Sequence, residues 1–101
     1  MQYNKLVRDQ IPAIIAESGR TCCTTVLTEH AFRTALLAKL VEEAKEVQAA
    51  DSAEVLTELA DVMEVFDYLL VAHQLTMDQV RQLQQERRHV RGGFESRLQL
   101  D

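Results

Sequence analysis

Apolar side chains recur at intervals of three and four residues through the middle of the chain, which is the spacing of an α-helix. From about residue 28 to 50 they fall at positions 32, 36, 37, 40, 44 and 47. From about 51 to 73 the inward positions are Val55, Leu59, Val62, Phe66, Leu69 and Leu70. Only a few residues separate the two runs, so we predict that they pack as an antiparallel helical hairpin.

Shorter helices are predicted on each side of this hairpin. Pro12 suits an early helical position and Gly19 suits a helix end, so one helix is expected between them. Thr76 and Gln79 have the spacing of a capping box, which predicts a last helix to about Val90. Residues 20–28, which are rich in β-branched residues and cysteine, are expected to be extended or a short strand. The predicted fold is all-α, with residues 1–101 as one domain.

The third predicted helix is apolar over much of its circumference. Its apolar residues beyond the hairpin face include Met63 and Val71. A helix of this kind usually has neighbours on several sides, and the rest of this chain offers few. We therefore expect a homo-oligomer, most simply a two-fold dimer.

The charge distribution narrows the classes of partner. Residues 29–78 hold eleven acidic and three basic side chains, a net charge of −8, whereas residues 1–28 sum to +1 and residues 79–101 to +2. An acidic middle does not favour binding to a nucleic-acid polymer. No apolar run reaches the length of a membrane span, and the N-terminus lacks the apolar core of a signal peptide, so a cytoplasmic protein is expected. The adjacent cysteines at 22 and 23 are interpreted as free thiols.

Four carboxylates lie on or beside the packing faces of the two long helices. Glu43 falls within the apolar stripe of the first, and Glu46 lies about 60° from it. Glu58 and Asp61 repeat this arrangement on the second, with Glu54 as a secondary candidate. Brought together, they would repel one another and need a cation, for which Mg²⁺ or Mn²⁺ suits hard oxygen ligands. Alternatively, Lys39, Lys45 or Arg33 forms salt bridges with these acids.

Four stretches of the sequence resemble one enzyme family, and two of them form its signature. EEAKE (42–46) and TELADVMEV (57–65) resemble the EExxE…ExxD signature of the MazG-like, all-α nucleoside triphosphate pyrophosphohydrolases, a group that includes phosphoribosyl-ATP pyrophosphohydrolase. YNKLVRDQIPAIIAESG (3–19) and VRGGFESRLQL (90–100) are similar to the two ends of one subgroup. The resemblance implies an oligomeric α-helical fold and Mg²⁺-dependent cleavage between the α and β phosphates. By position, it makes Glu43, Glu46, Glu58 and Asp61 the metal ligands.

The phosphate groups of a nucleotide would also need cations. Because of the resemblance, we expect Lys5 and Arg8 to contact phosphate, although ordinary surface charge is the alternative. Arg91 offers a guanidinium beside Gly92 and Gly93, whose backbone N–H groups could hold an anion. A plain helix C-cap explains the same residues equally well.

The leading hypothesis is therefore hydrolysis of a nucleoside triphosphate to the monophosphate and pyrophosphate, which could clear non-canonical nucleotides. If one carboxylate takes a proton from the attacking water, Glu46 is the first candidate because it lies at the edge of the stripe. Two alternatives stay open. One is the phosphoribosyl-ATP pyrophosphohydrolase of histidine synthesis, and the other is a non-catalytic helical adaptor.

Overall fold

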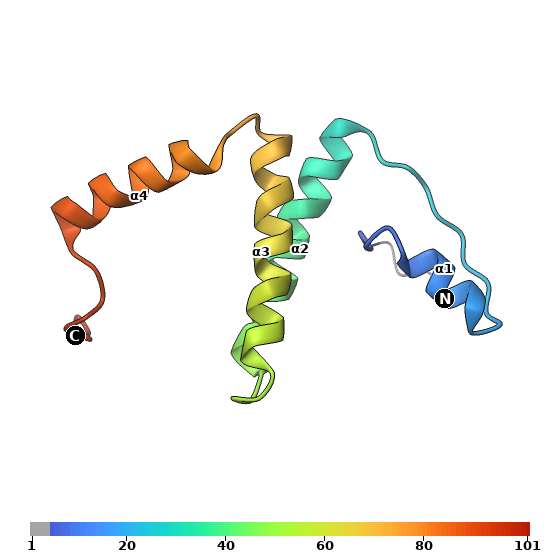
Figure 1. Ribbon diagram of the computed structural model, residues 1–101, viewed down its shortest axis with the longest axis horizontal. Helices are drawn as coiled ribbons and strands as arrows, with labels where there is room; N and C mark the ends of the chain where they lie inside the picture. Colours follow the sequence, from blue (N-terminus) through green and yellow to red (C-terminus); the bar gives the residue numbers. More distant parts are fainter. Residues whose placement is uncertain (1–4) are drawn as a thin grey trace.

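Four helices account for the regular structure of residues 5–101 (Figure 1). The computed structural model describes residues 5–101, so Tyr3 and Asn4 of the N-terminal match lie outside it. The helices are α1 (Ile11–Glu17), α2 (Glu29–Ala49), α3 (Val55–Ala72) and α4 (Met77–Arg91). No strand occurs within residues 5–101, and the segment 20–28 is irregular. The all-α prediction is confirmed, and the possible strand is absent.

Helices α2 and α3 form the predicted hairpin and are the pair that packs extensively. The Thr28 hydroxyl accepts a hydrogen bond from the Ala31 N–H and caps the start of α2. At the turn, the Asp51 carboxylate accepts hydrogen bonds from the backbone N–H groups of Ala53 and Glu54. These bonds close the connection, and α3 begins at Val55, a few residues later than the sequence pattern predicts.

The core is small and lies between α2 and α3. Leu36, which is 3% exposed, packs with Val65 and Leu69, and Leu70 is also buried. Partly buried side chains surround this cluster, namely Leu6, Phe32, Leu40 and Ala72. Leu6 comes from the N-terminal segment, so residues far apart in sequence complete the core.

Helices α1 and α4 extend away from the hairpin (Figure 1). The capping box of α4 is present, because the Gln79 N–H donates to the Thr76 hydroxyl and the Thr76 N–H donates to the Gln79 side chain. Despite this well-defined start, α4 has no buried residue. The radius of gyration is 17.4 Å, whereas a compact domain of this length has about 13 Å. The single chain is therefore extended rather than compact.

Helix α3 has a second apolar stripe on the side turned away from α2. Leu56, Leu59 and Met63 are exposed, and their three- and four-residue spacing places them on one face. Leu59 thus differs from the prediction, which assigned it to the inward face. The free cysteines, Cys22 and Cys23, are exposed in the irregular segment before α2. No helix among the described residues is both long and apolar enough to cross a membrane.

Candidate metal centre

Three of the four predicted carboxylates come together near the turn of the hairpin. Glu43 in α2 and the pair Glu58 and Asp61 in α3 each offer one oxygen, and these oxygens lie within 4.8 Å of one another. All three residues are partly buried. Glu58 and Asp61 are three residues apart and so share one face of α3, and the antiparallel pairing of the helices brings Glu43 to that face.

The geometry of this acidic triad fits a small divalent ion. Mg²⁺ binds oxygen at about 2.1 Å, so ligand oxygens on opposite sides of the ion are about 4.2 Å apart. The three oxygens lie within 4.8 Å of each other, and they would draw closer around an ion, because ligands on adjacent sides of an octahedral Mg²⁺ are about 3 Å apart. Carboxylates are also the hard oxygen donors that Mg²⁺ and Mn²⁺ prefer. Glu43, Glu58 and Asp61 therefore fit the predicted metal.

Glu46 lies at the margin of this triad. Its side chain is exposed, and its oxygens are not within the 4.8 Å group. Its charge is still felt, because the pKa of Glu58 is raised above its ordinary value. Burial is the largest cause of this rise, and the negative charges of neighbouring acids add to it, in the order Glu46, Asp61, Glu43 and Glu54. The charged form of Glu58 is therefore destabilised by its surroundings.

Cationic side chains surround the triad. Arg8 donates a hydrogen bond to the Asp61 carboxylate, with its Nη2 at 2.8 Å from Oδ1. Lys39 lies 3.8 Å from a Glu43 oxygen, as the salt-bridge alternative anticipated, and 3.4 Å from one of Glu42. The Arg8 contact is the one that sequence reasoning missed. Its partner lies 53 residues away, and no local spacing rule could indicate it.

Glu42, the neighbour of Glu43, has a different environment. Lys5 and Lys39 both contact its carboxylate, at 3.3 and 3.4 Å. Partial desolvation acts to raise the pKa of Glu42, but the charges of Lys39 and Lys5 outweigh it and the pKa is lowered. Glu42 therefore stays charged and paired with lysines, outside the triad.

The residues of the RGGF stretch lie at the far end of α4, which projects away from the hairpin (Figure 1). Arg91 is the last helical residue, and Gly92 has a φ of +83°, a conformation that favours glycine. The Gly92 N–H donates to the Arg88 carbonyl at 2.7 Å, which is a helix-capping contact. The side-chain carboxylate of Glu95 lies beside Gly93. The single chain therefore does not bring Arg91, Gly92 and Gly93 to the acidic triad.

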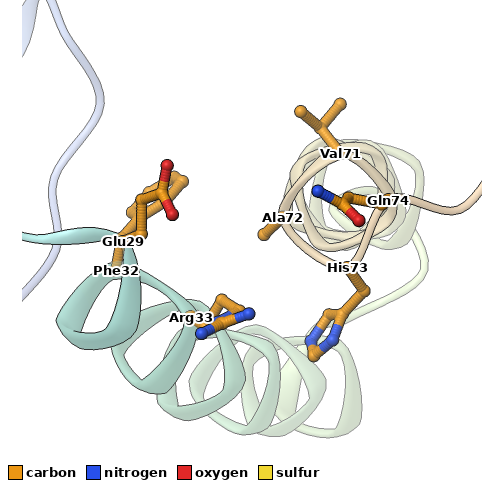
Figure 2. Close-up of a pocket in the computed structure, with 7 residues that line it drawn as sticks. All are labelled: Glu29, Phe32, Arg33, Val71, Ala72, His73 and Gln74. Carbon is orange, nitrogen blue, oxygen red and sulfur yellow. The ribbon is translucent and has the colours of Figure 1, made fainter.

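A cavity of about 380 Å³ opens at the other end of the hairpin. Glu29, Phe32 and Arg33 of α2 line one side. Val71 to Gln74 line the other, and Figure 2 shows the Arg33 guanidinium and the His73 ring pointing toward each other across the gap. His73 is twelve residues from Asp61, which is about 18 Å along a helix. This cavity is therefore separate from the triad.

Comparison with known proteins places the chain in a family. Residues 12–88 match the model of the phosphoribosyl-ATP pyrophosphohydrolase family, and the chain belongs to that family. The matched range includes the whole hairpin and all three residues of the triad.

Comparison with one relative and with the solved structures gives less information about function than the family match. The chain is similar to an uncharacterized protein of Mycolicibacterium smegmatis, at 48% identity over 48 residues, which is 48% of this chain and 49% of the relative. The match thus spans about half the length of that relative. No solved structure matches significantly.

Proposed function

We propose that this chain hydrolyses a nucleoside triphosphate between the α and β phosphates, with Mg²⁺ as cofactor, to a nucleoside monophosphate and pyrophosphate. The observation that carries the proposal is the acidic triad. It places three partly buried carboxylates from two helices within 4.8 Å, with Arg8 and Lys39 beside them, in a member of a pyrophosphohydrolase family.

The triad is the proposed metal-binding unit. Glu43, Glu58 and Asp61 would hold Mg²⁺, and Mn²⁺ could take its place. The bound ion would offset the charge of the phosphate oxygens and lower the pKa of a bound water. Burial of the carboxylates strengthens these interactions relative to those of fully exposed acids. Burial and the neighbouring acids raise the pKa of Glu58, and a nearby divalent cation would reverse this rise.

Other side chains would complete the reaction. Glu46, exposed beside the triad, is the proposed base that takes a proton from the attacking water. The water oxygen bonds to phosphorus as the bridging phosphoanhydride bond breaks, and pyrophosphate leaves with that bond's electron pair. Lys5 and Arg8 are the proposed phosphate contacts, since both lie at the edge of the hairpin near the triad.

A second copy of the chain is the proposed partner of the exposed stripe on α3. Leu56, Leu59 and Met63 form an apolar face that the single chain leaves uncovered. Two such faces related by a two-fold axis would build a four-helix bundle from two hairpins. In such an assembly, Arg91, Gly92 and Gly93 of one copy could approach the triad of the other. That arrangement would restore their predicted role in phosphate binding.

The test is a nucleotide panel with Mg²⁺ and identification of the products. We expect pyrophosphate and a nucleoside monophosphate, and we expect Glu43→Gln to lower kcat/KM by about a hundredfold or more, because the metal would lose a ligand. Glu64→Gln is the matched control, because Glu64 lies on α3 outside the triad. Release of orthophosphate, or full activity of Glu43→Gln, would contradict the proposal.

Phosphoribosyl-ATP is the second candidate substrate, and the family description favours it. Including it in the same panel separates the two activities by their kcat/KM values. Growth of a histidine-requiring strain that lacks this hydrolase is an independent readout. A non-catalytic adaptor predicts no turnover of any nucleotide, and no rise in melting temperature with Mg²⁺.

A further inference from the structure

Side chains of the N-terminal segment of residues 5–10 contact both helices of the hairpin beside the triad. On α2, Lys5 contacts the Glu42 carboxylate at 3.3 Å. Leu6 packs against the core cluster that contains Leu36. On α3, Arg8 donates to Asp61 at 2.8 Å. One short segment therefore carries an apolar anchor and a guanidinium that reaches a proposed metal ligand.

The Arg8 contact uses a carboxylate that the triad also needs. Asp61 accepts a hydrogen bond from Arg8 and supplies one of the three converging oxygens. A guanidinium and a divalent cation repel each other when both lie at the same carboxylate. Arg8 and a metal ion therefore compete for Asp61.

We propose that Arg8 is an exchangeable counter-ion, which neutralises Asp61 in the metal-free protein and moves to a phosphate of the nucleotide once a divalent ion occupies the triad. This inference rests on the proposed function, because it assigns Arg8 a second position in the same site. Guanidinium groups bind phosphate oxygens through paired hydrogen bonds, so a phosphate close to the triad offers Arg8 an equivalent partner.

The surroundings of Arg8 suit such an exchange. Its side chain is 58% exposed, and ion pairs in contact with water are weak enough to open easily. A cavity of about 90 Å³ lies where Lys5 and Leu6 meet α2, which leaves space beside the segment. The anchoring of Leu6 two residues away would keep a released guanidinium near the triad.

If this exchange occurs, loss of the Arg8 charge should strengthen the binding of metal and weaken the binding of nucleotide. Without nucleotide, Arg8→Gln should bind Mn²⁺ about fivefold more tightly than the wild type, since a competing positive charge is lost. Free Mn²⁺, measured by its EPR signal in solution, gives the affinity without any activity assay. With substrate, the same variant should raise KM about tenfold, because a charge-assisted contact to phosphate is lost.

Arg33→Gln is the matched control. It makes the same change in charge on α2, but Arg33 lines the cavity at the other end of the hairpin (Figure 2). The comparison therefore removes the general effect of a more negative protein on cation binding. In a double-mutant cycle with Asp61→Asn, the tightening caused by Arg8→Gln should fall to the level of Arg33→Gln, because the two residues act as a pair.

The outcomes separate this inference from the proposed function. If the wild type binds Mn²⁺ and hydrolyses nucleotide, but Arg8→Gln changes Mn²⁺ affinity no more than Arg33→Gln, the exchange is wrong and the proposed function stands. Tighter Mn²⁺ binding with an unchanged KM overturns the move to phosphate. If the wild type binds no Mn²⁺ and hydrolyses no nucleotide, both proposals fail.

Discussion

The hairpin and α4 differ in packing although both have clear local signals. Thr28 caps α2, and the full capping box of Thr76 and Gln79 begins α4. Yet α2 and α3 bury the core between them, whereas α4 buries no residue. The comparison shows that local sequence is sufficient to specify a helix. Its position depends on an apolar face that finds a complementary surface.

The same difference separates the predicted site residues. Glu43, Glu58 and Asp61 belong to the two helices that pack together, and their oxygens converge. Arg91 and Gly92 lie at the end of α4, and no contact among the described residues carries them to the hairpin. The acids therefore depend on contacts within one chain. The RGGF stretch could act together with these acids only if another surface, such as that of a second copy of the chain, brought it to them.

The largest expected effect on stability comes from the centre of the hairpin. Leu36→Ala should lower the free energy of unfolding by about 2–5 kcal/mol, because it leaves a cavity in a small core. Leu83→Ala, in α4, should change it by less than about 0.5 kcal/mol, since Leu83 is 56% exposed. Urea denaturation followed by circular dichroism measures both. A large loss for Leu83→Ala would show that α4 packs against another copy.

The second effect concerns the exposed stripe on α3. If two copies pair through this stripe, Leu59→Asp should raise the dissociation constant of the dimer by about a hundredfold, because a charge would be buried without a partner. Light scattering after gel filtration should then show the mass fall toward the 11.5 kDa of one chain. Val26→Asp, at an irregular position that is 97% exposed, should leave the mass unchanged. A wild type of 11.5 kDa at every concentration would contradict the dimer.

The smallest expected effect is the pH dependence of the stability of the metal-free protein. The pKa of Glu58 is raised by burial and by neighbouring acids, so from pH 4.5 up to that raised value the folded state binds more protons than the unfolded state. The stability of the metal-free protein should therefore fall as pH rises through this window. Glu42 has a lowered pKa and acts below pH 4.5, where its stabilisation is lost as pH falls. The two effects therefore act mainly on opposite sides of pH 4.5.

Glu58→Gln isolates this contribution. It should remove the decline above pH 4.5 and raise the melting temperature of the metal-free protein at neutral pH, whereas Glu64→Gln should keep the decline. The gain in melting temperature from Mg²⁺ should also be lost in Glu58→Gln, because the variant would lack a ligand. If the pH dependence of stability were unchanged in Glu58→Gln, the triad would not destabilise the charged form of Glu58.

Much of the fold was predictable because its signals are local. The helical spacing of Leu36, Leu40 and Val47 indicates α2, and the capping box at Thr76 gives the start of α4 correctly. The inward face of α3 was predicted less well, since Leu59 is exposed while Val65 is buried. Helix α3 is apolar on two faces, so periodicity alone cannot tell which face meets α2.

The sequence by itself determined the four helices and the hairpin, because helical periodicity and capping depend on residues a few positions apart. Only the tertiary structure decided which carboxylates meet. It brings Glu43, Glu58 and Asp61 together, leaves Glu46 at the margin and places Arg8 on Asp61. That pairing joins residues 53 positions apart, and it forms because the packing of Leu6 against the core holds the N-terminal segment against the hairpin.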